Sequence, residues 1–232
     1  MNPETDKAFQ QYLLPTFFID SDAPEIKAYA DKVCDGLTTD IEKAKALFYA
    51  IRDDVYYDPY NISPDKSAFK ASMVLKQKFG FCITKAILLT AVGRSQNIPS
   101  RLGFADVRNH LTSEKLMELM QTDVFAFHGY TQFFLEGKWV KATPAFNRSL
   151  CEASDIAPLE FDGRTDSIFH EYDRAGRKHM EYLNDHGRFA DFPFEKMIQV
   201  WNRHYPHFSD ELFSCLSGDF EKDAARMTAG RS

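Results

Sequence analysis

The strongest structural signal in this chain is a β-hairpin in residues 125–147, which read FAFHGYTQFFLEGKWVKATPAFN. Two runs of aromatic and β-branched residues flank the short segment Glu136-Gly137-Lys138. Such runs around a glycine-containing turn are typical of two adjacent antiparallel strands. The hairpin therefore indicates an antiparallel sheet in the middle of the chain.

Helical patterns surround this hairpin. Apolar residues recur at helical spacing in 39–55, where Thr39 or Asp40 is a plausible N-cap. Other predicted helices cover 23–35, 70–78, 82–97, 112–121 and 194–204, with a strand at Arg101–Val107 and a loop at 56–69. From about residue 150 to the last helix, the weak pattern indicates mixed loops. This order predicts an α+β fold with extra N-terminal helices. Since no linker interrupts residues 1–232, we expect a single domain.

The composition argues against several classes of protein. Acidic residues outnumber basic ones, the formal net charge is −6, and Lys and Arg form no basic run. We therefore expect no nucleic-acid partner and no membrane partner. No apolar run approaches the ~20 residues of a membrane helix, and the first residues lack the apolar stretch of a signal peptide. We expect a cytoplasmic protein whose four widely spaced cysteines are reduced and form no zinc-ribbon pair.

Cys82 stands where a predicted helix begins. Residues 79–82 are turn-like, and apolar residues then recur at helical spacing. The first turn of a helix presents unpaired N–H groups and the positive end of the dipole, which stabilise a thiolate and lower the pKa of a thiol. Gly80 permits close backbone approach, and the Cys82 N–H is a candidate oxyanion-hole donor. The alternative is that Cys82 is a small apolar residue of the core.

Two motifs in this region resemble those of the transglutaminase-like superfamily of thiol enzymes. The first is a Gly-x-Cys segment that opens a helix and is followed by an Ile-Pro-x-Arg step into a strand, here GFC at 80–82 and IPSR at 98–101. The second is a His with an aromatic residue two positions later and then Trp-Val, here HGY at 128–130 and WV at 139–140. The resemblance covers residues from about 74 to 147 and implies a papain-like core, with the Cys-bearing helix packed on the antiparallel sheet.

The resemblance also implies roles for three residues. Cys82 would be the nucleophile and His128 its general base and acid. An acidic residue just before a Pro orients the His in the family, but the residue before Pro144 is Thr143. A Thr hydroxyl accepts a hydrogen bond from the imidazole but brings no negative charge.

Several alternatives to Thr143 stay open at this stage. Asp106, Asn147 or Asp162 could orient His128 instead, or the enzyme could have lost its activity. His110 is a rival general base that ranks second, because His128 has the family spacing to Trp139.

A further group of polar residues lies in 166–186 and contains His170, Glu171, Asp173, His179, Glu181, Asp185 and His186. No pair has HExxH spacing, so we predict a polar segment rather than a metal site. Asp106 and Arg108 share a strand face and are expected to pair, while His204 and His207 are expected at the exposed end of a helix.

The predicted function is that of a thiol-dependent enzyme that hydrolyses peptide or amide bonds or transfers their acyl group. Thiol chemistry implies no cofactor, and the implied partner is a peptide or amide substrate. The alternative is a catalytically silent module that binds a peptide in the same cleft.

Overall fold

A computed structural model of the chain describes residues 9–110, 117–118, 120–169, 180–206, 220 and 222. Its helices are α2 (Pro24–Val33), α3 (Asp40–Asp54), the 3-10 helix η1 (Lys66–Phe69), α4 (Ala71–Gln77), α5 (Cys82–Ser95), α7 (Arg148–Ala153) and α8 (Phe194–His204). Its strands are β1 (Tyr56–Tyr57), β2 (Phe79–Gly80), β3 (Ser100–Asn109), β4 (Val124–Leu135), β5 (Lys138–Ala142) and β6 (Met180–Phe189).

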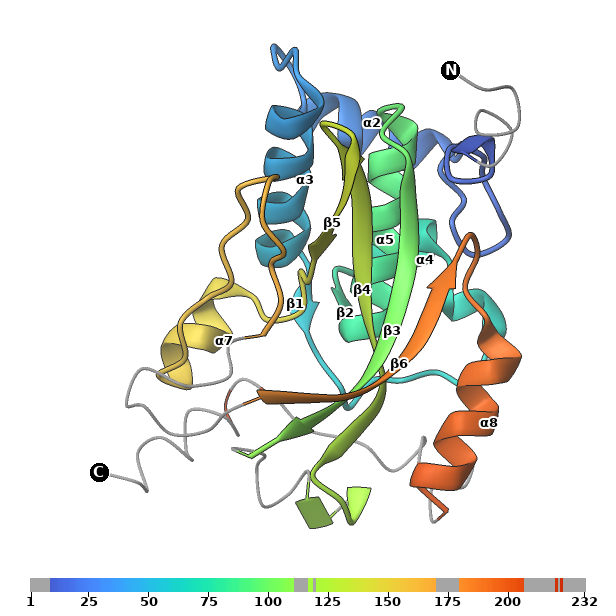
Figure 1. Cartoon of the computed structure of the whole chain (residues 1–232), viewed down its shortest axis with the longest axis vertical. Helices are drawn as coiled ribbons and strands as arrows, with labels where there is room; N and C mark the ends of the chain where they lie inside the picture. The colour runs from blue at the N-terminus through green and yellow to red at the C-terminus, as the bar shows by residue number, and fades with distance from the viewer. Residues whose placement is uncertain are drawn as a thin grey trace.

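The main sheet has the strand order β5-β4-β3-β6, and all neighbouring strands are antiparallel. Helix α5 packs against β3 and β4, and α2, α3 and α4 pack in turn around α5 (Figure 1). Helix α8 contacts β4 near the lower end of the sheet in this view. The predicted α+β fold, with a Cys-bearing helix on an antiparallel sheet, is confirmed.

Helix α5 is the centre of the core, since every residue from Cys82 to Arg94 is buried. Close packing against the sheet requires a small residue at Gly93, where a Cβ would lie 2.5 Å from the ring of Phe133. The few polar side chains on α5 find backbone partners. Lys85 donates to the carbonyls of Arg52 and Val55, where α3 ends. These bonds offset part of the cost of burying an amine.

The start of α5 differs from the sequence prediction. Residues 79 and 80 are not a turn but strand β2, which pairs in parallel with β1, so Tyr57 stands beside Gly80. Part of the predicted loop at 56–69 is therefore strand, and another part is helix η1. The expected close approach at Gly80 is confirmed, because a Cβ there would lie 2.5 Å from Oγ1 of Thr84. That hydroxyl accepts a hydrogen bond from the Phe81 N–H at 3.0 Å and so orders the helix start.

The predicted hairpin is confirmed as β4 and β5. Glu136 and Gly137 connect the strands with φ values of 46° and 84°, the left-handed pair of a tight hairpin turn. The Arg101 guanidinium lies 3.9 Å from the centre of the Trp139 ring and ties β3 to the hairpin.

The prediction of mixed loops after residue 150 is wrong for residues 180–189, which form strand β6 at the edge of the main sheet. Its sequence MEYLNDHGRF shows no alternation of apolar and polar residues. Two register irregularities against β3 account for this, because each inserts a residue and shifts the side chains that follow.

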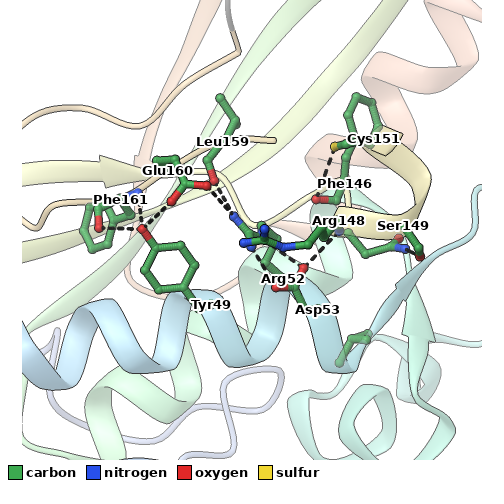
Figure 2. A network of polar contacts seen from close by, with 12 residues as sticks. Tyr49, Arg52, Asp53, Phe146, Arg148, Ser149, Cys151, Leu159, Glu160 and Phe161 are labelled. Carbon is green, nitrogen blue, oxygen red and sulfur yellow. Dashed lines mark hydrogen bonds and ion pairs between the residues drawn. The ribbon is translucent and has the colours of Figure 1, made fainter. Parts of the chain in front are cut away.

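A polar network joins α3 to the segments around it (Figure 2). The buried Arg52 pairs with Asp53 at 2.7 Å and donates to the Leu159 carbonyl at 2.7 Å. Asp53 also accepts from the Arg148 N–H at the start of α7. These contacts anchor α7 and residues 159–161 to the helical layer.

The other predicted helices match α2, α3, α4 and α8 closely, and Thr39 is the N-cap of α3. The helix predicted at 112–121 lies largely outside the described residues. Among the described residues, Cys34, Cys82 and Cys151 form no disulfide, and Cys215 lies outside the described part. Among the described helices, none has the length and apolar character needed to cross a membrane.

Candidate active site

Cys82 is the first residue of α5 and is 9% exposed. The backbone N–H groups of Gly129, Ile83 and Cys82 itself are directed at the sulfur and favour its thiolate form. Gly129 can approach this closely only without a side chain, since a Cβ there would lie 3.0 Å from Cα of Ile83. The start of α5 and strand β4 therefore meet at the sulfur.

The expected lowering of the thiol pKa is wrong for the structure as described. Burial raises the pKa of Cys82 to about 11, and the three N–H groups offset only part of this rise. Burial likewise lowers the pKa of His128 to about 3. Cys82 and His128 are therefore both neutral in the resting site, because each charge alone would be poorly solvated.

Cys82 and His128 line the same pocket, which has a volume of about 60 Å³. Aromatic side chains from distant parts of the chain form much of its wall: Tyr57, Phe81, Phe125, Trp201 and Tyr205. The centre of the imidazole ring lies 4.8 Å from that of the Phe169 ring, which also packs against Phe146. The structure thus brings together the two residues that the motifs placed 46 positions apart.

A β-bulge holds the backbone just before His128. The pairing of β3 with β4 shifts so that Ala126 and Phe127 both stand opposite Asp106, and Phe127 has a φ of 64°. Side chains replace the missing strand bonds. Asp106 accepts from the Phe127 N–H at 2.9 Å, and the Tyr205 hydroxyl accepts from the Ala126 N–H at 2.6 Å. The Trp201 indole donates to the Ala126 carbonyl at 3.1 Å.

Thr143 follows β5 and is buried, and its N–H donates to the Ser167 carbonyl. Its Oγ1 and Nε2 of His128 are both buried without a hydrogen-bond partner in the described part of the chain. The hydroxyl of Tyr182 interacts with the Thr143 side chain, but at a geometry that does not satisfy Oγ1. The hydrogen-bonding capacity of His128 Nε2 and of the Thr143 hydroxyl is thus left unsatisfied in the interior.

The three alternatives to Thr143 have other partners. The Asp106 carboxylate lies 2.7 Å from Nε2 of His186 and accepts a hydrogen bond from the Asn184 amide. Burial alone would raise the pKa of this carboxyl, but its hydrogen-bond partners lower it. Asn147 accepts from the Tyr57 N–H at 2.9 Å. Asp162 caps its own exposed turn by accepting from Arg164 and Thr165 N–H groups.

The predicted pair of Asp106 and Arg108 is also wrong. Arg108 instead forms ion pairs with Asp123 at 3.2 Å and with Glu181 at 3.6 Å. The bulge and the arrival of β6 give each side chain a nearer partner than the other.

His110 lies at the exposed end of β3 within 3.2 Å of Glu181 and does not line the pocket of Cys82. Of the polar group at 166–186, His170, Glu171, Asp173 and His179 fall outside the described residues. In the described ranges, no three Cys, His, Asp or Glu side chains gather as metal ligands. His204 is exposed at the end of α8, as predicted, and His207 lies outside the described part.

Four aromatic residues near Cys82 were missed by sequence reasoning. Tyr57, Trp201 and Tyr205 line the pocket, and Tyr182 reaches the Thr143 side chain from β6. Only their aromatic character was visible in the sequence, and aromatic residues are common throughout this chain, with 21 Phe and 10 Tyr. Tyr57 lies in β1, Tyr182 in β6, and Trp201 and Tyr205 in and just after α8, so these residues come from segments far apart in the sequence.

Two of the solved structures that resemble this chain are similar over part of their length. One is "Putative Cysteine Protease" from Cytophaga hutchinsonii, with 17% identity, a TM-score of 0.48, and coverage of 82% of this chain and 57% of the other. The second is "putative protease" from Parabacteroides distasonis, with 18% identity, a TM-score of 0.37, and coverage of 51% and 23%. The chain therefore spans less than two thirds of the length of either. No curated protein matched the sequence.

The model of the transglutaminase-like superfamily matches residues 27–144. This range begins in α2 and includes α5 with Cys82, the bulge before His128 and the whole hairpin. Because the match extends over half of the chain, the protein belongs to the transglutaminase-like superfamily.

Proposed function

We propose that this protein is a thiol-dependent enzyme that hydrolyses amide bonds of peptides or transfers their acyl group. The observation that supports the proposal is the shared pocket, which Cys82 and His128 both line, together with three backbone N–H groups that favour the thiolate form of Cys82. Backbone donors of this kind stabilise negative charge without needing to reorganise during the reaction.

In the proposed reaction, the Cys82 thiol passes its proton to His128 as the sulfur attacks the substrate carbonyl. Nε2 of His128 is enclosed, which leaves Nδ1 as the ring nitrogen to receive this proton. The imidazolium then protonates the leaving amine as the C–N bond breaks, and an acyl-enzyme remains on the sulfur. Water or a second amine attacks that acyl group and regenerates the thiol.

Thr143 is proposed to orient His128 as a neutral partner. Its unsatisfied Oγ1 is a suitable acceptor for the Nε2–H of the tautomer that leaves Nδ1 free. The contacts of Asp106, Asn147 and Asp162 with other residues support Thr143 over these alternatives.

Covalent trapping with acetyl-alanyl-valyl vinyl sulfone tests the proposal. Intact-mass measurement should show one adduct on the wild type and none on Cys82→Ala. Cys151→Ala is the matched control, since Cys151 is also a buried thiol outside any disulfide, and this variant should still form one adduct. Reversible binding of the acetyl-alanyl-valyl amide without any adduct would contradict the enzyme and favour the rival function, a silent peptide-binding module. The missing acidic residue at Thr143 is the observation that favours this rival.

A further inference from the structure

The pocket that holds Cys82 is almost entirely apolar. Besides the aromatic side chains described above, Pro59, Ile62 and Ile83 contribute to its wall, and none of the lining residues that the structure describes is an Asp, Glu, Lys or Arg. Two of its polar groups are already engaged with the bulge, because the Trp201 indole and the Tyr205 hydroxyl bond to the backbone of Ala126. An occupant would therefore meet chiefly hydrocarbon.

Because Sγ of Cys82 is part of the pocket wall, its position indicates which part of a substrate would enter the pocket. Attack joins Sγ of Cys82 to the carbonyl carbon, and the next atom along the acyl group is the carbon that carries the side chain. That side chain is then the nearest group able to fill the cavity. The leaving amine departs and is not held at the sulfur.

The volume of the cavity limits the size of that side chain. At about 60 Å³ it is smaller than half of the ~150 Å³ apolar cavity that accommodates a benzene ring. A short aliphatic group fits within this space, whereas a phenyl ring would require the wall to move. A charged group would find no counter-ion among the described lining residues and would lose much of its hydration free energy.

We propose that this cavity is the acyl-side specificity pocket and that it selects a short aliphatic side chain, of alanine or valine size, on the residue whose carbonyl is attacked. This inference rests on the proposed function and adds its substrate class. Ile62 is the best place to alter the pocket, since it is only half-buried and lies outside the catalytic pair.

A series of acetyl-alanyl-X aminomethylcoumarin amides tests the pocket, with X as alanine, valine, phenylalanine, lysine or glutamate. For the wild type, kcat/KM should be at least about tenfold higher for valine than for phenylalanine, and lower again for lysine and glutamate. Ile62→Ala enlarges the cavity and should raise the phenylalanine-to-valine ratio by about fivefold or more. The matched control is Ile168→Ala, a half-buried isoleucine in a separate pocket with Tyr130 and Tyr182, and it should leave the ratio unchanged.

Three outcomes would contradict the inference. Two of them leave the proposed thiol enzyme intact, and the third contradicts it as well. Preference of the wild type for lysine, glutamate or phenylalanine would overturn the pocket assignment but leave the thiol enzyme intact. An unchanged phenylalanine-to-valine ratio of kcat/KM in Ile62→Ala, with melting temperature and Cys82 labelling preserved, would also overturn only the pocket assignment. Absence of Cys82-dependent turnover and labelling across the whole series would overturn the proposed function and this inference together.

Discussion

The Asp106 carboxylate accepts a hydrogen bond from the Phe127 N–H at 2.9 Å, one residue before His128. Phe127 has a left-handed φ of 64°, a conformation that costs a residue with a side chain roughly 1–2 kcal/mol. His186, 2.7 Å from the same carboxylate, keeps Asp106 in place. Backbone strain beside the candidate base is thus maintained by a buried side chain on the neighbouring strand.

Replacement of this carboxylate should disturb His128 indirectly. We expect Asp106→Ala to lower the kcat of Cys82-dependent hydrolysis by about tenfold or more with little change in KM, because the bulge loses its acceptor. Asp106→Asn should recover most of the kcat, since its amide oxygen still accepts from Phe127. Steady-state kinetics below the melting transition of each variant would measure both effects.

Asp123→Ala is the control for the loss of a carboxylate, because the half-exposed Asp123 side chain pairs with Arg108. We expect it to leave kcat unchanged. Equal loss of kcat in Asp106→Ala and Asp106→Asn would contradict a role through the backbone and indicate that the negative charge itself is needed.

Gly129→Ala should separate β4 from the start of α5. The new Cβ would lie 3.0 Å from Cα of Ile83 and 3.2 Å from the Phe104 ring, and the backbone atom cannot move aside. We expect a loss of about 1–3 kcal/mol in unfolding free energy, together with at least tenfold slower vinyl sulfone labelling of Cys82. Urea denaturation and timed intact-mass measurements would test the two effects.

Gly137→Ala provides the comparison for this variant. It strains the hairpin turn, where φ is 84°, but its Cβ would meet no atom within 4 Å. It should therefore lose stability by about 1 kcal/mol while Cys82 reacts at the wild-type rate. Normal labelling in Gly129→Ala would show that the contact at Ile83 does not position the sulfur.

The buried His128 should make the protein sensitive to acid. Its folded pKa is lowered to about 3, below the ~6.5 of an exposed imidazole, so between these values the unfolded chain binds more protons. Stability should therefore fall as pH decreases, by about 3 kcal/mol from His128 between pH 7 and pH 4. Urea unfolding at several pH values should show a shallower loss for His128→Gln, whereas His204→Gln, exposed on α8, should follow the wild type. Identical slopes for His128→Gln and wild type would contradict a neutral, buried imidazole.

The buried Lys85 should change the stability of the protein above pH 7, whereas His128 changes it below pH 7. Burial lowers its pKa to about 7, while an exposed lysine titrates near ~10.4, so the folded chain releases this proton first. Wild-type stability should rise by about 2 kcal/mol from this group between pH 7 and pH 8.5.

Lys85→Met removes both the titration and the bonds to the Arg52 and Val55 carbonyls. We expect it to be less stable than wild type and to lack the rise above pH 7. Chemical denaturation at both pH values would measure this difference. A rise of the same size in Lys85→Met would assign it to another group.

The elements that could be predicted from the sequence are those whose signal is local. The helix that begins at Cys82, the Thr39 cap of α3 and the Glu136-Gly137 turn each depend on residues a few positions apart. Helical spacing, capping and turn geometry act over that distance, so the sequence alone revealed them. The motifs around Cys82 and His128 likewise identified the candidate pair.

The features that could not be predicted depend on contacts between distant residues. Strand β6 exists as a strand because β3 offers it hydrogen bonds, and its bulges hide any alternation. Asp106 pairs with His186, 80 positions away, instead of with Arg108. The pKa of the Cys82 thiol was expected to be lowered by the helix start, but burial raises it in the structure. The sequence shows the helix start and does not show which side chains surround the sulfur. Helix start, caps and turn were thus determined by the sequence itself, whereas burial, pairing and the protonation state of the site were decided by the tertiary structure, because desolvation depends on atoms brought from the whole chain.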